Sequence, residues 1–224
     1  MTDTRTDDGT ADGRAPLTLV WDWPLRMWHW LLALCVTGSL TTGLLGDITL
    51  MEWHMRLGYA AIALLGFRLG WAVWGARYAL WHTFALSPRR FVAFLRGQGH
   101  RWVRTAPGTV LVLAMLAAIA FQAGTGLFTS DDIFTDGPLV RQASSDTVAT
   151  LSSLHRQAYW VILGLIGVHL AAHLAYALRR DPTPLGMFTG RKPFAGAPTR
   201  HLWLRGLATA AAAAAAVWWA LPSI

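Results

Sequence analysis

The chain has 224 residues, of which 54% are hydrophobic and only 14% charged, and its mean hydropathy is +0.38. This composition is too apolar for an ordinary soluble domain and indicates an integral membrane protein. The formal net charge of +7 comes from arginines that flank apolar segments and form no basic face of a soluble module, which excludes a nucleic-acid-binding protein.

Residues 1–20 are polar and acidic and have neither the basic end nor the apolar centre of a cleaved signal peptide, so they predict a disordered cytoplasmic tail. Residues 21–192 then contain four apolar segments, each with the approximately 20 residues that a membrane-spanning helix needs. They predict one domain, an all-α four-helix transmembrane bundle. The segments are residues 25–45, 54–74, 107–128 and 154–178.

The remaining residues, 193–224, predict a linker and a fifth C-terminal transmembrane helix at about residues 202–221. Its run ATAAAAAAAV favours a helix, and Trp218 and Trp219 lie where an aromatic belt is expected. In the loop before the third span, the stretch SPRRFVAFLRG indicates either a short amphipathic helix on the inner membrane surface or a solvated linker.

The charges of the loops predict the orientation of the chain. Short cytoplasmic loops accumulate Lys and Arg, and the loops after the second and fourth spans are rich in arginine. The other two loops are acidic, so we expect a cytoplasmic N-terminus. The acidic side chains of the second outer loop either fix this topology or dock a basic partner protein. They are Asp131, Asp132, Asp136 and Asp146.

Four histidines lie in or at the ends of the predicted spans. His29 is near the inner end of the first, His54 at the outer start of the second, His155 at the outer start of the fourth, and His169 deeper in the fourth. Ionisable side chains in a span are unfavourable and call for a partner. Because Cys35 is the only cysteine, cysteine-based zinc and iron–sulfur sites and a CxxCH haem attachment are excluded, and any metal must be held by histidine.

The spacing on the fourth span places imidazoles at two depths of one helix face. Fourteen residues separate His155 from His169, which leaves them within about 40° of each other and about 21 Å apart in depth. His54 shares the outer level and His29 the inner one. Any one of these histidines alone is explained by a polar core or interfacial role, but four at matched depths indicate two stacked haems with histidine on both axial positions.

Three further residues are candidates for contacts with these cofactors. Arg68, fourteen residues after His54, is expected either to pair with a propionate of the inner haem or to snorkel to the inner surface. Arg26 lies one turn before the histidine of the first span and is a similar case. His173 shares a face with His169, and depth alone does not decide which of the two binds iron.

Five motifs in their order along about residues 20–192 resemble the prokaryotic cytochrome b561 family, and the related b-type cytochrome subunits of nickel–iron hydrogenases and formate dehydrogenases. The resemblance implies a di-haem protein of the bacterial inner membrane that exchanges electrons with quinones and with a redox partner, such as a c-type cytochrome or a peripheral oxidoreductase subunit. The motifs are WDWPLRMWHW, HMRLG, TGLFTSDDIFTDGPL, LHRQAYWVILGLIGVHLAAH and LGMFTGRK.

The resemblance also implies the ligands. Two non-covalent haem b groups would be held by His29 with His169 and by His54 with His155, which leaves His173 free to hydrogen-bond a propionate or a quinone carbonyl, or to lie at the interface with water. The alternative function is a transporter that uses the intramembrane histidines for protons or metal ions. The sequence shows no inverted repeat or broken helix of the kind that transporters commonly have.

Overall fold

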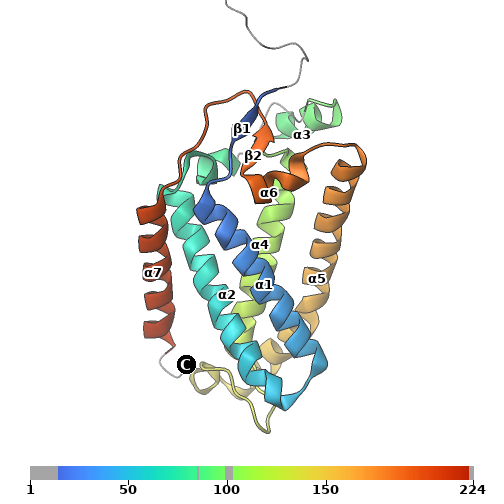
Figure 1. Cartoon of the computed structure of the whole chain (residues 1–224). Coiled ribbons are helices and arrows are strands. Elements are labelled where there is room, and N and C mark those ends of the chain that lie inside the picture. Colours follow the sequence, from blue (N-terminus) through green and yellow to red (C-terminus); the bar gives the residue numbers. More distant parts are fainter. Residues whose placement is uncertain (1–14, 85, 99–102, 222–224) are drawn as a thin grey trace, which may run out of the picture.

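The structure is a computed structural model that describes residues 15–84, 86–98 and 103–221. Four long helices form its bundle (Figure 1), with mean hydropathies between 1.3 and 2.0 and lengths sufficient to cross a membrane. The predicted four-helix membrane bundle is therefore confirmed. The helices are α1 (Trp23–Leu45), α2 (Ile48–Trp74), α4 (Ala106–Gly126) and α5 (Ser145–Leu178).

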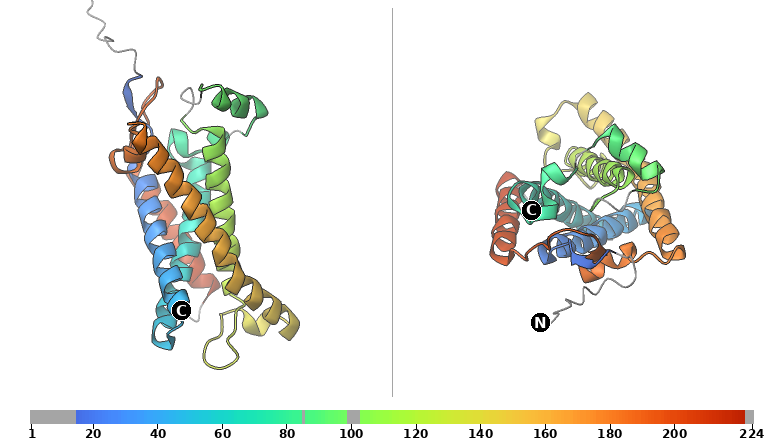
Figure 2. Two further views of the ribbon diagram at one scale, coloured as in Figure 1. Left: turned by 90° about the vertical axis from the view of Figure 1, so that its right-hand side faces the viewer. Right: turned by 90° about the horizontal axis from the view of Figure 1, so that it is seen from above.

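The four helices are arranged as two hairpins, α1 with α2 and α4 with α5, and α2 also packs against α4 (Figure 2). Gly46 ends α1 with a φ of 63°, a left-handed conformation that glycine adopts without steric cost. Asp47 then begins α2, because its side chain accepts a hydrogen bond from the Thr49 amide at 2.8 Å. This tight turn fixes α1 and α2 as antiparallel neighbours.

Two helices begin earlier than their apolar residues predict. α5 starts at Ser145 because Ser144 caps it through the Thr147 amide at 3.3 Å and Asp146 lies in its first turn, where a negative charge is favourable. α2 likewise begins at Ile48, directly after its Asp47 cap. Both starts were missed because the capping residue, and not the apolar run, sets where each helix begins.

The start of the described chain pairs with a segment that follows α5, in a small antiparallel sheet. Strand β1 (Leu17–Leu19) pairs with β2 (Arg191–Pro193), and Thr18 donates a hydrogen bond to the Phe194 carbonyl. Part of the tail predicted as disordered is thus folded, while residues 1–14 lie outside the described residues. Its strand partner is far away in the sequence, so no local pattern indicates it. We call the end with β1, β2 and α6 (Gly186–Thr189) the inner end, and the opposite end the outer end.

The other short elements lie around the bundle. The loop before α4 contains α3 (Pro88–Leu95), so the first of the two alternatives for this stretch, a short helix, is present. The expected fifth helix is present as α7, which packs along α2, but it is not among the four described helices that are apolar enough to cross a membrane, so its transmembrane position stays a prediction. Single turns of 3-10 helix complete the chain, and η5 leads directly into α6. Their bounds are α7 (Trp203–Ala220), η1 (Arg77–Ala79), η2 (Trp81–Phe84), η4 (Val140–Gln142) and η5 (Thr183–Leu185).

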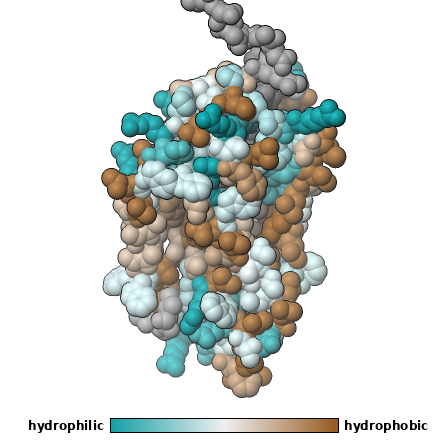
Figure 3. All heavy atoms as spheres, in the orientation of Figure 1, coloured by the Kyte–Doolittle hydropathy of each residue, from teal (hydrophilic) through white to brown (hydrophobic). Residues whose placement is uncertain are grey.

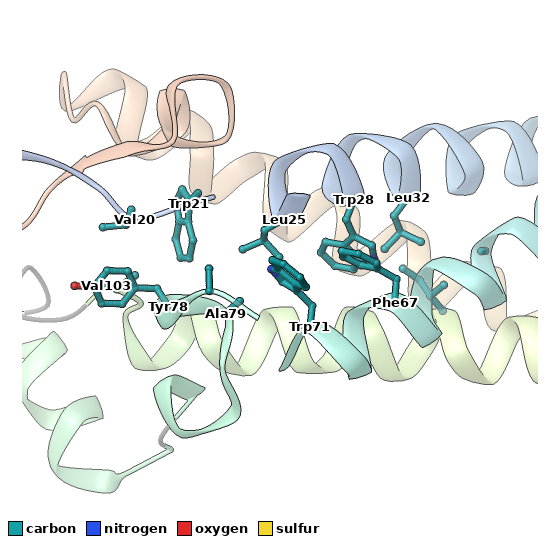
Figure 4. Close-up of a cluster of buried hydrophobic side chains, with 13 residues drawn as sticks. Val20, Trp21, Leu25, Trp28, Leu32, Phe67, Trp71, Tyr78, Ala79 and Val103 are labelled. Atoms are coloured by element: carbon teal, nitrogen blue, oxygen red, sulfur yellow. The ribbon is translucent and has the colours of Figure 1, made fainter. Parts of the chain in front are cut away.

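Aromatic side chains fill the core between α1 and α2 (Figure 4). Phe67 and Trp71 stack with ring centroids 5.5 Å apart, and the Trp28 indole donates to the Leu64 carbonyl at 2.7 Å. On the surface shown in Figure 3, hydrophilic side chains gather at the two ends and hydrophobic ones lie between them. An apolar surface between polar ends is the arrangement that a lipid bilayer requires.

Candidate functional site

Two histidines on different helices face each other near the outer end. The ring centroids of His54 on α2 and His155 on α5 are 6.0 Å apart, with an angle of 88° between the ring planes. A metal–imidazole bond of about 2 Å on each side of one iron atom would place two opposed ring centroids roughly 6 Å apart. The predicted outer pair is brought together, and its separation fits one iron atom.

Backbone carbonyls orient both of these rings. His54 Nδ1 donates to the Ser39 carbonyl at 2.9 Å, and His155 Nδ1 donates to the Gln122 carbonyl at 2.9 Å. A ring that donates its Nδ1 proton keeps a lone pair on Nε2, the nitrogen then available to a metal. The Gln122 amide also donates to the His155 carbonyl at 3.0 Å. Helices α1 and α4 therefore supply the groups that fix the tautomer of each predicted ligand.

Each outer ring also lies against a glycine of the neighbouring helix. A Cβ atom on Gly43 of α1 would lie 3.0 Å from His54 Cε1, and one on Gly126 of α4 would lie 2.9 Å from His155 Cε1. Such contacts are closer than packed carbon atoms normally approach. Glycine at these two positions gives each imidazole the space that it occupies.

A cavity of about 370 Å³ surrounds this histidine pair, within the size range of about 300–1,000 Å³ that is usual for ligand pockets. All four helices of the bundle line it, largely with apolar side chains such as Leu40, Met55 and Ile119. An apolar cavity with two opposed imidazoles suits a flat, mostly apolar macrocycle with a central metal. The residues present fit a haem.

A second pair of histidines lies toward the inner end. The centroids of His29 on α1 and His169 on α5 are 6.4 Å apart, again a separation that one iron atom bridges. His173 packs on the His169 ring, with centroids 4.5 Å apart. Nδ1 of His29 is buried and has no hydrogen-bond partner among the described residues, so no described carbonyl orients this ring as one does in the outer pair. Of the two inner histidines of α5, His169 is the one whose ring lies against His29.

Arg68 lies inside the protein near this level. It is only 5% exposed, and its Nη2 donates to the Ala79 carbonyl at 3.3 Å. The guanidinium lies over the rings of Trp28 and Phe84, at 5.6 and 5.0 Å from their centroids. Its Nη1 is buried without a hydrogen-bond partner in the described part of the chain. The structure therefore contradicts snorkelling to the inner surface, one of the two alternatives from the sequence.

Arg26 makes a different set of contacts. Its guanidinium donates to the Phe188 carbonyl and lies 4.7 Å from the centroid of the Trp23 ring. Phe188 belongs to α6, and its ring packs against Trp30 with centroids 4.7 Å apart. Arg26 thus ties the inner end of α1 to the segment that crosses it.

Comparison with protein families gives a match over residues 20–190, to the family described as prokaryotic cytochrome b561. The chain belongs to this family. It is therefore a bacterial membrane cytochrome of the b type, which binds haem b and takes part in electron transfer. Comparison with curated proteins and with solved structures gives no match. Its relation to the hydrogenase and formate dehydrogenase subunits stays a prediction.

In this b561-family cytochrome, a second arginine, Arg104, is partly buried among aromatic rings, which its sequence context did not indicate. Arg104 lies 4.6 Å from the centroid of Trp21 and 4.3 Å from that of Phe84, and donates to the Thr83 hydroxyl at 3.0 Å. Burial first, and then the charge of Arg68, lower the pKa of Arg104 to about 9, so it is protonated at neutral pH. In the sequence it is one more arginine of the inner loop, because its contact with Phe84 depends on tertiary packing.

Proposed function

We propose that this cytochrome is a di-haem electron carrier that connects the quinone pool to a redox partner protein. His54 and His155 would hold one haem b near the outer end, and His29 and His169 a second near the inner end. The observation that carries this proposal is the presence of two opposed imidazole pairs, at 6.0 and 6.4 Å, in one bundle.

Two imidazoles holding each haem would favour electron transfer over chemistry at the metal. A bound haem b supplies a one-electron couple, and ligation by two imidazoles would leave no position on its iron for a substrate. The carbonyls of Ser39 and Gln122 keep Nε2 of each outer ring directed to the metal and raise its basicity. The cavity is lined largely by apolar side chains, which would limit solvent rearrangement when an electron arrives or leaves.

A single helix sets the line of transfer. His155 and His169 both belong to α5, fourteen residues apart, and this interval corresponds to about 21 Å along a helix. The opposing ligands come from α2 at the outer level and α1 at the inner level. The two haems would therefore lie one above the other across the membrane.

The quinone would bind near the inner haem, and the partner protein would bind near the outer haem. His173 lies beside His169 and offers a hydrogen bond to a quinone carbonyl or an inner-haem propionate. At the outer end, the acidic loop favours a basic partner such as a c-type cytochrome. The cytoplasmic N-terminus and the role as membrane subunit of a larger oxidoreductase belong to the same proposal.

Spectroscopy of the purified protein tests this function. We expect a b-type reduced-minus-oxidised spectrum, and reduction of the haem when a ubiquinol or menaquinol analogue is added without oxygen. If the haem neither accepts electrons from quinols nor gives them to quinones, the quinone-linked function is wrong. A protein without haem whose histidines are needed for ion flux in vesicles would support the transporter instead.

A further inference from the structure

Arg156 lies at the boundary between two spaces at the outer end. It follows His155 on α5 and lines the cavity that holds the outer histidine pair. It also lines a neighbouring hollow of about 600 Å³ between α5 and the outer loop, beside Ser130 and Thr135, which belong to both spaces. Its guanidinium therefore lies where the cavity meets the outer surface.

This guanidinium has no partner within the described residues. Arg156 makes no hydrogen bond or ion pair with them, whereas Arg56, at the same end of the bundle, pairs with Glu52 and lies over the Trp53 ring. An unpaired guanidinium beside an apolar cavity is an open binding group for an anion, because its fork of N–H donors matches a carboxylate.

The other charged residue that lines the outer cavity is already engaged. Asp131 Oδ1 accepts hydrogen bonds from the amides of Ile133, Phe134 and Thr135 at 3.0, 2.8 and 2.8 Å. These bonds, led by the contact with Thr135, lower the pKa of Asp131 and hold its carboxylate in the loop. Arg156 is thus the one charged group of the described cavity lining that remains available to a ligand.

We infer that Arg156 binds a propionate of the outer haem. This inference rests on the proposed haem between His54 and His155. The propionates are carboxylates, and burying them in the apolar part of the cavity without a partner is unfavourable. At the outer mouth of the cavity, Arg156 would offer them a charge-assisted pair. Its positive charge beside the ring favours the reduced, more negative form of that haem.

Redox titration of three variants of the holoprotein tests this role. Arg156→Gln removes the charge, Arg156→Lys keeps it without the planar fork, and Arg141→Gln removes an outer charge that lies outside both spaces. The outer haem is identified in the titration as the redox transition that disappears in His54→Ala. We expect Arg156→Gln to make reduction of this haem up to tenfold less favourable, equivalent to 59 mV for one electron. Redox difference infrared spectra should show an altered propionate carboxylate band.

The controls separate this contact from a general effect. Both haem potentials should stay the same in Arg141→Gln, and the inner-haem potential should stay the same in Arg156→Gln. The outer-haem potential of Arg156→Lys should be close to that of the unsubstituted protein. Selective loss of the outer haem from Arg156→Gln would also support the contact. If Arg156→Gln disrupts the whole protein, unchanged carboxylate bands in Arg156→Lys would overturn the inference. An unchanged potential of the outer haem in Arg156→Gln would also overturn the inference. If the unsubstituted protein has no outer haem, the proposed function itself is refuted.

Discussion

The imidazole rings of His54 and His155 come from different helices and face each other with centroids 6.0 Å apart. Each ring is fixed by a helix other than its own. Ser39 on α1 accepts from the first ring and Gln122 on α4 from the second. All four helices are therefore needed to build the outer site, and a change in any of them alters ligand geometry. Substitutions at residues that are not haem ligands should therefore also affect the haem sites.

The glycine beside His155 should be intolerant of a side chain. In Gly126→Ala the new methyl group would lie 2.9 Å from His155 Cε1, so we expect displacement of the ring, a lower content of outer haem and a stability loss of about 1–3 kcal/mol. Gly124→Ala on the same helix is the matched control, because a Cβ there meets nothing within 4 Å. Equal haem content and thermal stability of the two variants would count against the fitted site.

The two inner histidines of α5 should respond differently to substitution. We expect His169→Ala to lose the inner haem, because its ring faces His29 with centroids 6.4 Å apart. His173→Ala should retain both haems and show slower reduction by quinol. Haem content by pyridine haemochrome and stopped-flow reduction make the comparison. The ligand assignment is reversed if the inner haem disappears from the His173 variant and stays in the His169 variant.

Arg68→Gln should shift the potential of the inner haem. A buried positive charge near a haem stabilises the reduced form, so we expect its removal to lower the potential by on the order of tens of millivolts. Arg26→Gln is the matched control at the same end, because Arg26 is bound to the Phe188 carbonyl of α6. Redox titration that gives the same small shift for both variants would contradict a propionate contact for Arg68.

The outer loop should loosen in acid. Hydrogen bonds from the Thr135, Phe134 and Ile133 amides lower the pKa of Asp131 in the folded protein. Its stabilising effect is therefore complete above the unfolded value of about 4 and is lost as the pH falls through the lower folded value. We expect loop amides to exchange faster with deuterium as the pH falls through this range, after correction for intrinsic exchange.

Asp131→Asn should remove most of this dependence on pH. Asp132→Asn is the control, because Asp132 has a φ of 59°, which asparagine also adopts, and lies in the same loop. A loop that responds to acid equally in both variants would show that Asp131 is not the titrating group.

The parts of the fold that follow local rules were predictable from the sequence. Apolar length gave the four spans, and the fourteen-residue interval between His155 and His169 gave two levels on one face. The contacts that refine the site were not predictable, because Ser39 and Gln122 act through backbone carbonyls, which every residue has. Gly43 and Gly126 each follow a threonine, but a Thr-Gly pair is too common to indicate a ligand.

The haem-to-protein ratio tests the central claim most directly. We predict a ratio of two for the unchanged protein and of one for both His54→Ala and His29→Ala, with the two variants retaining haems of different potential. This result follows from two separate imidazole pairs at 6.0 and 6.4 Å. A ratio of one in the unchanged protein, or two haems retained in both variants, would contradict the account.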